Sequence, residues 1–99
     1  MLAVIGSFRF PPDRVAEALP LMQKVITATS MEVGCSAYSY ATDVADPGLF
    51  RVVKIWDSRA AIKAHFATPH MLQWSEARAA LGLSDRIVTA FPLGEGETL

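Results

Sequence analysis

The chain has 99 residues, with nine basic and ten acidic side chains and a net charge of −1. This length is typical of one domain, and residues 1–99 are expected to form one, with 92–99 as a C-terminal tail. The charges are spread without a basic cluster, which argues against nucleic-acid binding and a polybasic membrane surface. The apolar content of 52% is high for a small chain and indicates a pocket or an oligomer interface in addition to the core.

The N-terminus and the single cysteine restrict the protein class further. Cys35 has no second cysteine to pair with, so an internal disulfide and a cysteine-rich zinc site are excluded. The first ten residues lack a basic leader and are interrupted by Gly6 and Arg9, which is typical of a strand rather than a signal peptide. No apolar segment approaches the ~20 residues of a membrane span. A cytoplasmic protein is therefore expected.

Residues 2–10 alternate with strand periodicity, and both faces are largely apolar, so this first strand is expected to be covered on both sides. Pro11-Pro12-Asp13 ends it and opens a helix. From Val15 the spacing is helical, with an apolar stripe of Val15, Leu19, Met22 and Ile26, supported by Ala18 and Val25. Pro20 is expected to kink this helix or to begin a second segment, and Gly34 to end it.

The central part of the chain predicts a hairpin. Residues 35–42 alternate small and larger side chains, which is typical of a strand. Asp46-Pro47-Gly48 is a turn signal, because proline presets one central position and glycine accepts a positive φ at the next. Residues 49–56 then form a strand antiparallel to the previous one. One of its faces carries Phe50, Val52, Lys54 and Trp56.

Two helical segments and a strand follow. Ser58 is placed to cap a helix whose buried stripe includes Ile62 and Phe66. Pro69 cannot continue that helix, and with Thr68 as its cap it begins a second segment. The apolar side of this segment comprises Met71, Trp74, Ala77 and Leu81, and Gly82 ends it. Residues 85–92 form the final strand.

The predicted order is β-α-β-β-α-β, which defines an α+β, ferredoxin-like fold with a four-stranded antiparallel sheet. Both helical regions then lie on one face of the sheet. The opposite face still carries apolar side chains, so a second sheet is expected to cover it. We therefore expect a homodimer formed through the open sheet face.

The two histidines, His65 and His70, are the only ones in the chain. Metal-binding helices place two ligands four residues apart so that both point one way. Here the spacing is five, Pro69 interrupts the helix, and no acidic residue lies between them. No metal site is expected from this pattern.

Considered separately, His65 and His70 are expected to have different roles. His65 lies at the edge of a buried stripe. On sequence alone a half-buried histidine bonded to the backbone is favoured over a proton carrier in a pocket. His70 lies in the first helical turn, where a protonated imidazole is electrostatically disfavoured. A neutral packing or capping residue is the better interpretation of His70.

Lys54 alternates with bulky apolar residues on one strand face. It either extends its ammonium to the sheet edge or faces a pocket, where it could hold an anion and where burial would lower its pKa. Trp56 on the same strand is either core or pocket wall. Tyr38, on the neighbouring strand, has the same two alternatives, and Cys35 is expected to be structural.

Several of these stretches resemble the antibiotic biosynthesis monooxygenase family, which includes the quinol monooxygenases. These stretches are Gly34-Cys35 followed by Tyr38, the Asp-Pro-Gly turn, Trp56-Asp57-Ser58 and residues 65–70. The most specific part is the pattern W-x-S-x-x-A-x-x-x-H-x-x-[ST]-P-H. The resemblance extends from the first strand to residue 91. It implies a dimeric α+β barrel with a pocket in each protomer between helices and sheet.

The resemblance also implies oxygenation of electron-rich phenols, anthrones or quinols with O2 and without metal or flavin, so no cofactor is expected. A phenol loses a proton, the anion passes an electron to O2, and the radical pair recombines. The protein must supply an apolar cavity, a proton acceptor and a cation for the developing oxyanion. His65 and Lys54 are the expected catalytic residues. The expected substrate-binding residues are Trp56, Val52, Phe66, Tyr38 and His70.

Two departures keep other functions open. Tailoring and haem-degrading members of the superfamily use a pocket asparagine, and this chain has none. That disfavours a haem-binding or haem-degrading protein. Quinol-type relatives commonly have glutamate where this chain has Lys54, which leaves the substrate open. A non-catalytic dimeric module that binds a small apolar ligand, or serves as an interaction domain, is the first alternative.

Overall fold

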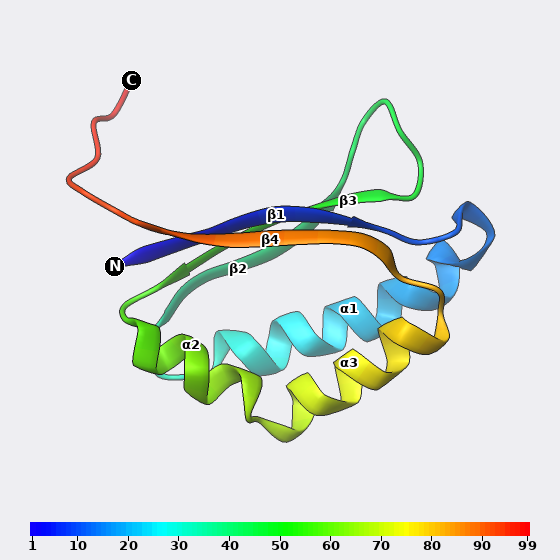
Figure 1. The fold of residues 1–99 in the computed structure, drawn as a ribbon, viewed down its shortest axis with the longest axis horizontal. Helices are drawn as coiled ribbons and strands as arrows, with labels where there is room; N and C mark the ends of the chain where they lie inside the picture. The colour runs from blue at the N-terminus through cyan, green and yellow to red at the C-terminus, as the bar shows by residue number, and fades with distance from the viewer.

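The computed structural model describes residues 1–99 as a sheet lying on a layer of helices (Figure 1). In chain order the elements are β1 (Leu2–Arg9), a 3-10 turn (Pro12–Arg14), α1 (Val15–Ser30), β2 (Cys35–Thr42), β3 (Leu49–Trp56), α2 (Arg59–Phe66), α3 (Pro69–Ala80) and β4 (Ser84–Pro92). The four strands pair antiparallel in the order β2-β3-β1-β4. The predicted ferredoxin-like α+β fold, with its helices on one face, is confirmed.

The face of β3 that carries Lys54 packs against the helices. Its four residues are at most 4% exposed, namely Phe50, Val52, Lys54 and Trp56. This confirms the predicted alternation. On β1 the helices cover only one face, and Ile5 on the other is 49% exposed in the single chain, so cover on both sides of this strand stays a prediction that depends on a second sheet. The exposed side is the outer face of the sheet, which no helix reaches (Figure 1).

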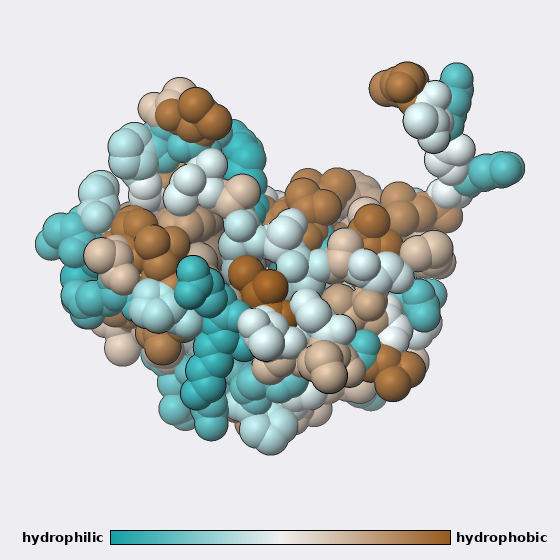
Figure 2. Space-filling model, turned by 180° about the vertical axis from the view of Figure 1, so that it is seen from behind, coloured by the Kyte–Doolittle hydropathy of each residue, from teal (hydrophilic) through white to brown (hydrophobic).

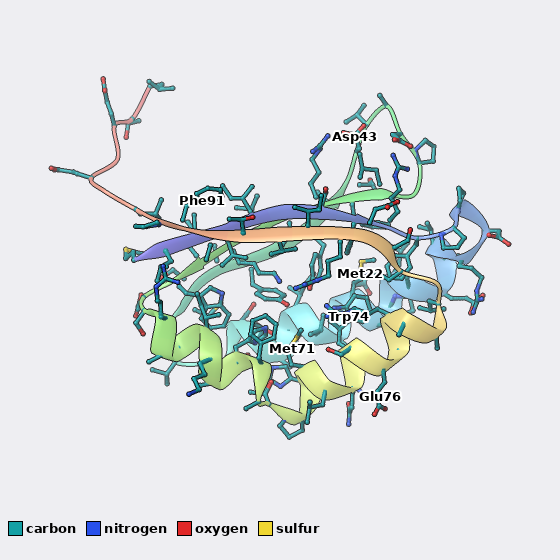
Figure 3. The ribbon with its side chains drawn as sticks, in the orientation of Figure 1. Met22, Asp43, Met71, Trp74, Glu76 and Phe91 are labelled. Atoms are coloured by element: carbon teal, nitrogen blue, oxygen red, sulfur yellow. The ribbon has the colours of Figure 1, made fainter.

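The main core lies between the sheet and the pair α1 and α3. Met22, Met71 and Trp74 point into this layer, whereas Glu76 points to solvent (Figure 3). Aromatic rings of the strands complete it, with the centroids of Phe8 and Phe50 5.5 Å apart. A smaller cluster of Val4, Tyr38 and Trp56 lies over α2. The candidate site is built on this smaller cluster.

α1 departs from its prediction in three respects. It continues through Pro20 as one helix, so no second segment begins there. It ends at Ser30, four residues before Gly34, which lies in the following loop. The buried face comprises Ala18, Met22, Val25 and Thr29, while Leu19 is 43% exposed. The predicted stripe is thus rotated by about one residue, because alanine and threonine face the sheet where larger residues were expected.

The break between α2 and α3 follows the prediction closely. The Ser58 hydroxyl accepts a hydrogen bond from the N–H of Ala61, which caps α2. Thr68 Oγ1 accepts one from the N–H of Met71 at 3.4 Å, and Pro69 is the first residue of α3. Gly82, with a φ of +87°, follows the end of α3. The local capping chemistry therefore fixes where one helix stops and the other starts.

The buried face of α2 also differs from its prediction. Phe66, expected in the buried stripe, is 46% exposed, whereas His65 is 2% exposed. His65 is the only buried residue of this helix. The short helix has few large apolar residues, so packing against the aromatic side chains of β2 and β3 decides its rotation.

The outer face of the sheet exposes large apolar side chains, among them Ile5, Val53, Ile87 and Phe91. Figure 2 shows apolar side chains gathered along the sheet side of the body, near the C-terminal tail. The tail after Pro92 leaves the body without helix or strand (Figure 1). None of the helices has the length and apolar character needed to span a membrane.

Candidate functional site

A pocket of about 190 Å³ lies between α2 and the helix-facing side of the sheet. The sequence nominated four of its lining residues, and the structure brings these together: Lys54, Trp56, His65 and Phe66. The remaining wall comes from β1, α2 and β4, through Val4, Ile62, Arg86, Val88 and Ala90. The wall is therefore mostly apolar, with one imidazole and two cationic side chains.

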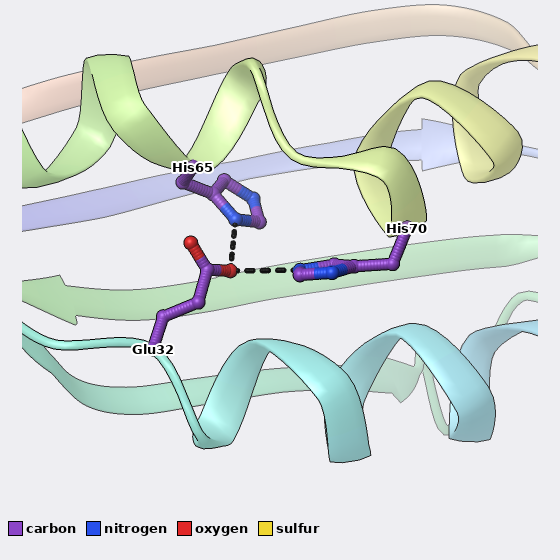
Figure 4. A group of neighbouring side chains, drawn as sticks. All are labelled: Glu32, His65 and His70. Carbon is purple, nitrogen blue, oxygen red and sulfur yellow. Dashed lines mark hydrogen bonds and ion pairs between the residues drawn. The ribbon is translucent and has the colours of Figure 1, made fainter.

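His65 is bonded to a carboxylate on one side and to nothing on the other. Its Nδ1 lies 2.7 Å from Oε2 of Glu32, in the loop between α1 and β2 (Figure 4). Its Nε2 is buried and has no hydrogen-bond partner. A buried polar atom without a partner is uncommon and calls for a ligand or a functional role. The sequence-favoured alternative, a half-buried histidine bonded to the backbone, is wrong.

The bond to Glu32 determines which ring nitrogen of His65 carries the proton. An ionised carboxylate only accepts hydrogen bonds, so Nδ1 must donate its N–H. In a neutral imidazole Nε2 then keeps its lone pair. Burial lowers the pKa of His65 below its ordinary value. The hydrogen bond to Glu32 and the charge of Glu32 raise this pKa, but burial is the larger effect, so the neutral form is favoured at pH 7. His65, which lines the pocket, thus has a buried acceptor nitrogen on the side of its ring away from Glu32.

Lys54 is buried beside this acceptor without a counter-charge. It is 4% exposed and takes part in none of the five salt bridges of the structure. Its Nζ lies 4.6 Å from the ring centroid of Tyr38 and 5.3 Å from that of Tyr40. Burial, and to a smaller extent repulsion from Arg86 and Arg78, lowers the pKa of Lys54 to about 7. Such a group gains most from an anion that enters the pocket.

Tyr38 and Val52 support the pocket from behind rather than lining it. Val52 is 2% exposed in the core, and Tyr38 packs edge-on against Trp56 and His65, with centroids 6.4 and 5.4 Å away. The hydroxyls of Tyr38 and Tyr40 are hydrogen-bonded at 2.9 Å. Burial raises the pKa of Tyr38, so its hydroxyl stays protonated at neutral pH. These tyrosines position the lysine and the histidine.

His70 lies on the other side of Glu32, away from the pocket. Its Nε2 is 2.8 Å from the same carboxylate oxygen that His65 contacts. It lines a separate groove of about 610 Å³ between α1 and α3, together with Leu21, Lys24, Val25, Gln73, Trp74, Glu76 and Ala77. Its expected role in substrate binding in the inner pocket is not supported by this position.

Sequence reasoning missed Glu32 and Arg86. Glu32 is 33 residues from His65 along the chain, and its loop carries no motif of its own. The sequence argument on the histidines considered only acids close to them and so overlooked this one. Arg86 is on the edge strand, where an arginine is ordinarily a solvated surface residue. Only the sheet order, with β4 beside β1, could have placed it at the pocket.

The fold and this pocket define a ferredoxin-like α+β protein with a site between its helices and its sheet. The family model for antibiotic biosynthesis monooxygenases matches residues 1–77. The chain therefore belongs to the antibiotic biosynthesis monooxygenase family, as the resemblance in its sequence indicated.

Individual relatives agree with this assignment. The Escherichia coli K12 protein named "Probable quinol monooxygenase YgiN" is 32% identical over 87 residues, which cover 78% of this chain and 84% of YgiN. A crystal structure of an antibiotic biosynthesis monooxygenase is 30% identical with a TM-score of 0.88, covering 96% of this chain and all of that one. A Deinococcus radiodurans structure has a TM-score of 0.93 at 28% identity, covering 100% and 98% of the two chains.

Proposed function

We propose that the protein is a monooxygenase that oxidises a small phenol or quinol with O2, using no metal or flavin for this reaction. The observation that carries the proposal is the unpartnered, buried Nε2 of His65, a residue that lines a mostly apolar pocket and whose Nδ1 is bonded to Glu32. Family membership and the likeness to a quinol monooxygenase support an oxidoreductase of this class.

In the proposed reaction His65 Nε2 removes the phenolic proton, and the imidazolium is stabilised by the Glu32 carboxylate. The phenolate passes one electron to O2, and the two radicals combine to form a peroxide. Breaking its O–O bond leaves one oxygen atom in the product, and the other departs as water with two hydrogen atoms from the substrate. Lys54 and Arg86 stabilise the phenolate and the reduced oxygen species electrostatically.

The pocket size restricts the substrate. Sites for drug-sized ligands have volumes of roughly 300–1,000 Å³, and this pocket has about 190 Å³. We propose a one- or two-ring phenol or quinol in preference to a three-ring anthrone. Because Lys54 and Arg86 leave the wall cationic, a substrate that is readily ionised is favoured over a neutral hydrocarbon.

We propose that the working form is a homodimer joined through the outer sheet face, because that face exposes Ile5, Val53, Ile87 and Phe91. A cytoplasmic location stays a prediction from the sequence. The alternative functions are a non-catalytic module that binds a small aromatic ligand and a protein that binds or degrades haem. They are outcomes of the following experiment.

Oxygen-electrode traces with 1,4-naphthoquinol, a substituted hydroquinone and anthrone, in buffer containing a chelator, test the proposal. Uptake above the autoxidation blank is expected for the one- and two-ring compounds. His65→Gln should lower the rate at least about 100-fold. Lys54→Met should lower it as well, whereas Lys63→Met, on the exposed side of α2, should not.

Uptake at the blank rate with every compound would reject the oxygenase and favour the binding module. A Soret shift on adding haemin would support the haem protein instead. An oxygenase whose rate is unchanged in both His65→Gln and Lys54→Met would mean that the residue roles are wrong.

A further inference from the structure

We propose that Glu32, His65 and His70 form a binding site for one divalent transition-metal ion, with Zn²⁺ as the probe. Two imidazoles and one carboxylate are the donor set of several catalytic zinc sites and of non-haem iron oxygenases. A metal ion at these residues is a property separate from the proposed oxygenase activity, in which His65 Nε2 removes a proton and Glu32 stabilises the imidazolium.

The three donor atoms already converge on one point. His65 Nδ1 and His70 Nε2 lie 2.7 and 2.8 Å from Glu32 Oε2, and all three atoms lie within 4.8 Å of one another (Figure 4). Donors around a tetrahedral zinc ion at 2.0–2.2 Å are about 3.3 Å apart. Each ring therefore has to move about half an ångström from the carboxylate oxygen, while the two imidazole nitrogens, which lie within 4.8 Å of each other, have to come closer together. The Oε1 atom of Glu32 accepts no side-chain hydrogen bond and is free to take part.

Backbone hydrogen bonds position all three residues, with the two histidines on helices and Glu32 in a loop. Thr68 Oγ1 donates to the carbonyl of His65 at 2.7 Å and accepts from the N–H of Met71, which fixes the junction between α2 and α3. Glu32 belongs to the loop between α1 and β2, outside helix and strand. Small shifts of the two rings and of the Glu32 carboxylate can close the donors around an ion while this junction stays in place.

Burial and access also suit an ion. The side chain of His65 is 2% exposed and that of Glu32 14%, so both donors are held largely out of water. The side chain of His70 is 23% exposed and lines the groove between α1 and α3. His70 is thus the donor that connects the cluster to this groove.

Metal binding would change what His65 offers to the pocket. In the metal-free chain Nδ1 carries the proton and Nε2 is an acceptor. An ion on Nδ1 displaces that proton, and a neutral imidazole then carries its only N–H on Nε2. The pocket would be offered a donor in place of an acceptor. Metal loading and proton abstraction by His65 are therefore mutually exclusive states of one side chain.

Calorimetric titration of the untagged, EDTA-dialysed chain with ZnCl₂ tests the site. One ion per chain is expected, and since these are the only histidines, no other imidazole competes. Glu32→Gln and His70→Gln should each weaken binding at least about tenfold. Cys35→Ser is the matched control, because it removes the only thiol of the chain, whose Sγ bonds to the carbonyl of Ala37 and to none of the three donors, and it should bind as the parent does.

Circular dichroism and thermal melting in EDTA check that both variants fold. If His70→Gln does not fold, Glu32→Gln, a substitution in a loop, still tests the site. Imidazole ¹⁵N spectra give a second measurement, in which Zn²⁺ should move the proton of His65 from Nδ1 to Nε2. The absence of one-to-one binding, or binding that survives both substitutions, would overturn the proposal.

Discussion

Three aromatic rings hold the imidazole of His65 in place. The ring centroids of Trp56, Tyr38 and Phe66 lie 4.9, 5.4 and 5.4 Å from that of His65. With Glu32 bonded to Nδ1, the ring cannot turn to find a partner for Nε2 without breaking that bond. The unpartnered acceptor is thus maintained by packing, at a cost to stability that a ligand would offset.

Lys54 is expected to destabilise the fold near neutral pH. Its pKa is about 7 in the folded chain and 10.5 in an ordinary exposed lysine. Between these values the unfolded chain binds the proton that the folded chain has released, so stability rises with pH in this window. Below about pH 7 the cost is complete, and at about 1.4 kcal/mol per pKa unit it amounts to several kcal/mol.

Urea unfolding between pH 6 and 9.5 measures this effect. Lys54→Met should be more stable than the parent at pH 7 by a few kcal/mol, and the difference should shrink as the pH approaches 9.5. Lys63→Met, exposed on α2, should match the parent within about 0.5 kcal/mol. Parallel pH profiles for the parent and Lys54→Met would show that Lys54 is not desolvated.

For single residues, the sequence identified His65 and Lys54 as unusual but could not decide between a structural role and a role in a pocket. Each choice depends on a distant neighbour. Glu32 reaches His65 from another loop, and Arg86 reaches the pocket of Lys54 from the last strand. Neither contact leaves a local pattern in the sequence.

The loop between α1 and β2 is the element that carries the carboxylate. Gly34 in this loop has a φ of +91°, and a Cβ there would lie 2.7 Å from the Cβ of Ala61 on α2. Glycine is needed for the backbone angle and for the close approach to α2. Through this approach Gly34 sets the distance between Glu32 and the helix that carries His65.

Gly34→Ala should therefore lower the free energy of unfolding by about 1–3 kcal/mol and weaken the bond between Glu32 and His65. Urea unfolding measures the first effect, and the imidazole ¹⁵N shifts of His65 measure the second. Gly96→Ala is the matched control, since a Cβ there has nothing within 4 Å, and it should change neither. Equal stability of Gly34→Ala and the parent would contradict the prediction.

Elements whose signals are local were predicted well. The hairpin strands 35–42 and 49–56, the turn before Leu49 and the two helix caps depend on residues close in sequence. The buried faces of α1 and α2 were misassigned, because they depend on which strands lie opposite them. A short helix with few large apolar residues takes its rotation from its surroundings.

For the whole molecule, the two faces of the sheet have different partners. The inner face is covered by helices, and the outer face leaves Ile5, Val53 and Phe91 between 47% and 49% exposed. Phe91 points away from the helices (Figure 3). In a single chain this apolar area would contact water, which is the physical reason for proposing a dimer.

Light scattering on the eluting protein tests the dimer. The parent should have twice the chain mass of 10.7 kDa. Val53→Asp, in the middle of the outer face, should return it to the single-chain mass, because burying an unpaired carboxylate at the contact is unfavourable. Lys63→Met on the helix side should stay dimeric. A parent that elutes at 10.7 kDa would reject the dimer.

The pocket also has two halves with different origins in the chain. Glu32, Lys54, Trp56 and His65 lie within residues 1–77, which match the family model. Arg86, Val88 and Ala90 lie beyond them, on an edge strand that pairs only with β1. The proposed proton acceptor and its carboxylate thus lie in one part of the chain, and Arg86 and the wall beside it lie in another. Exchanging residues 84–92 for those of a relative should redirect substrate choice while leaving the proton acceptor in place.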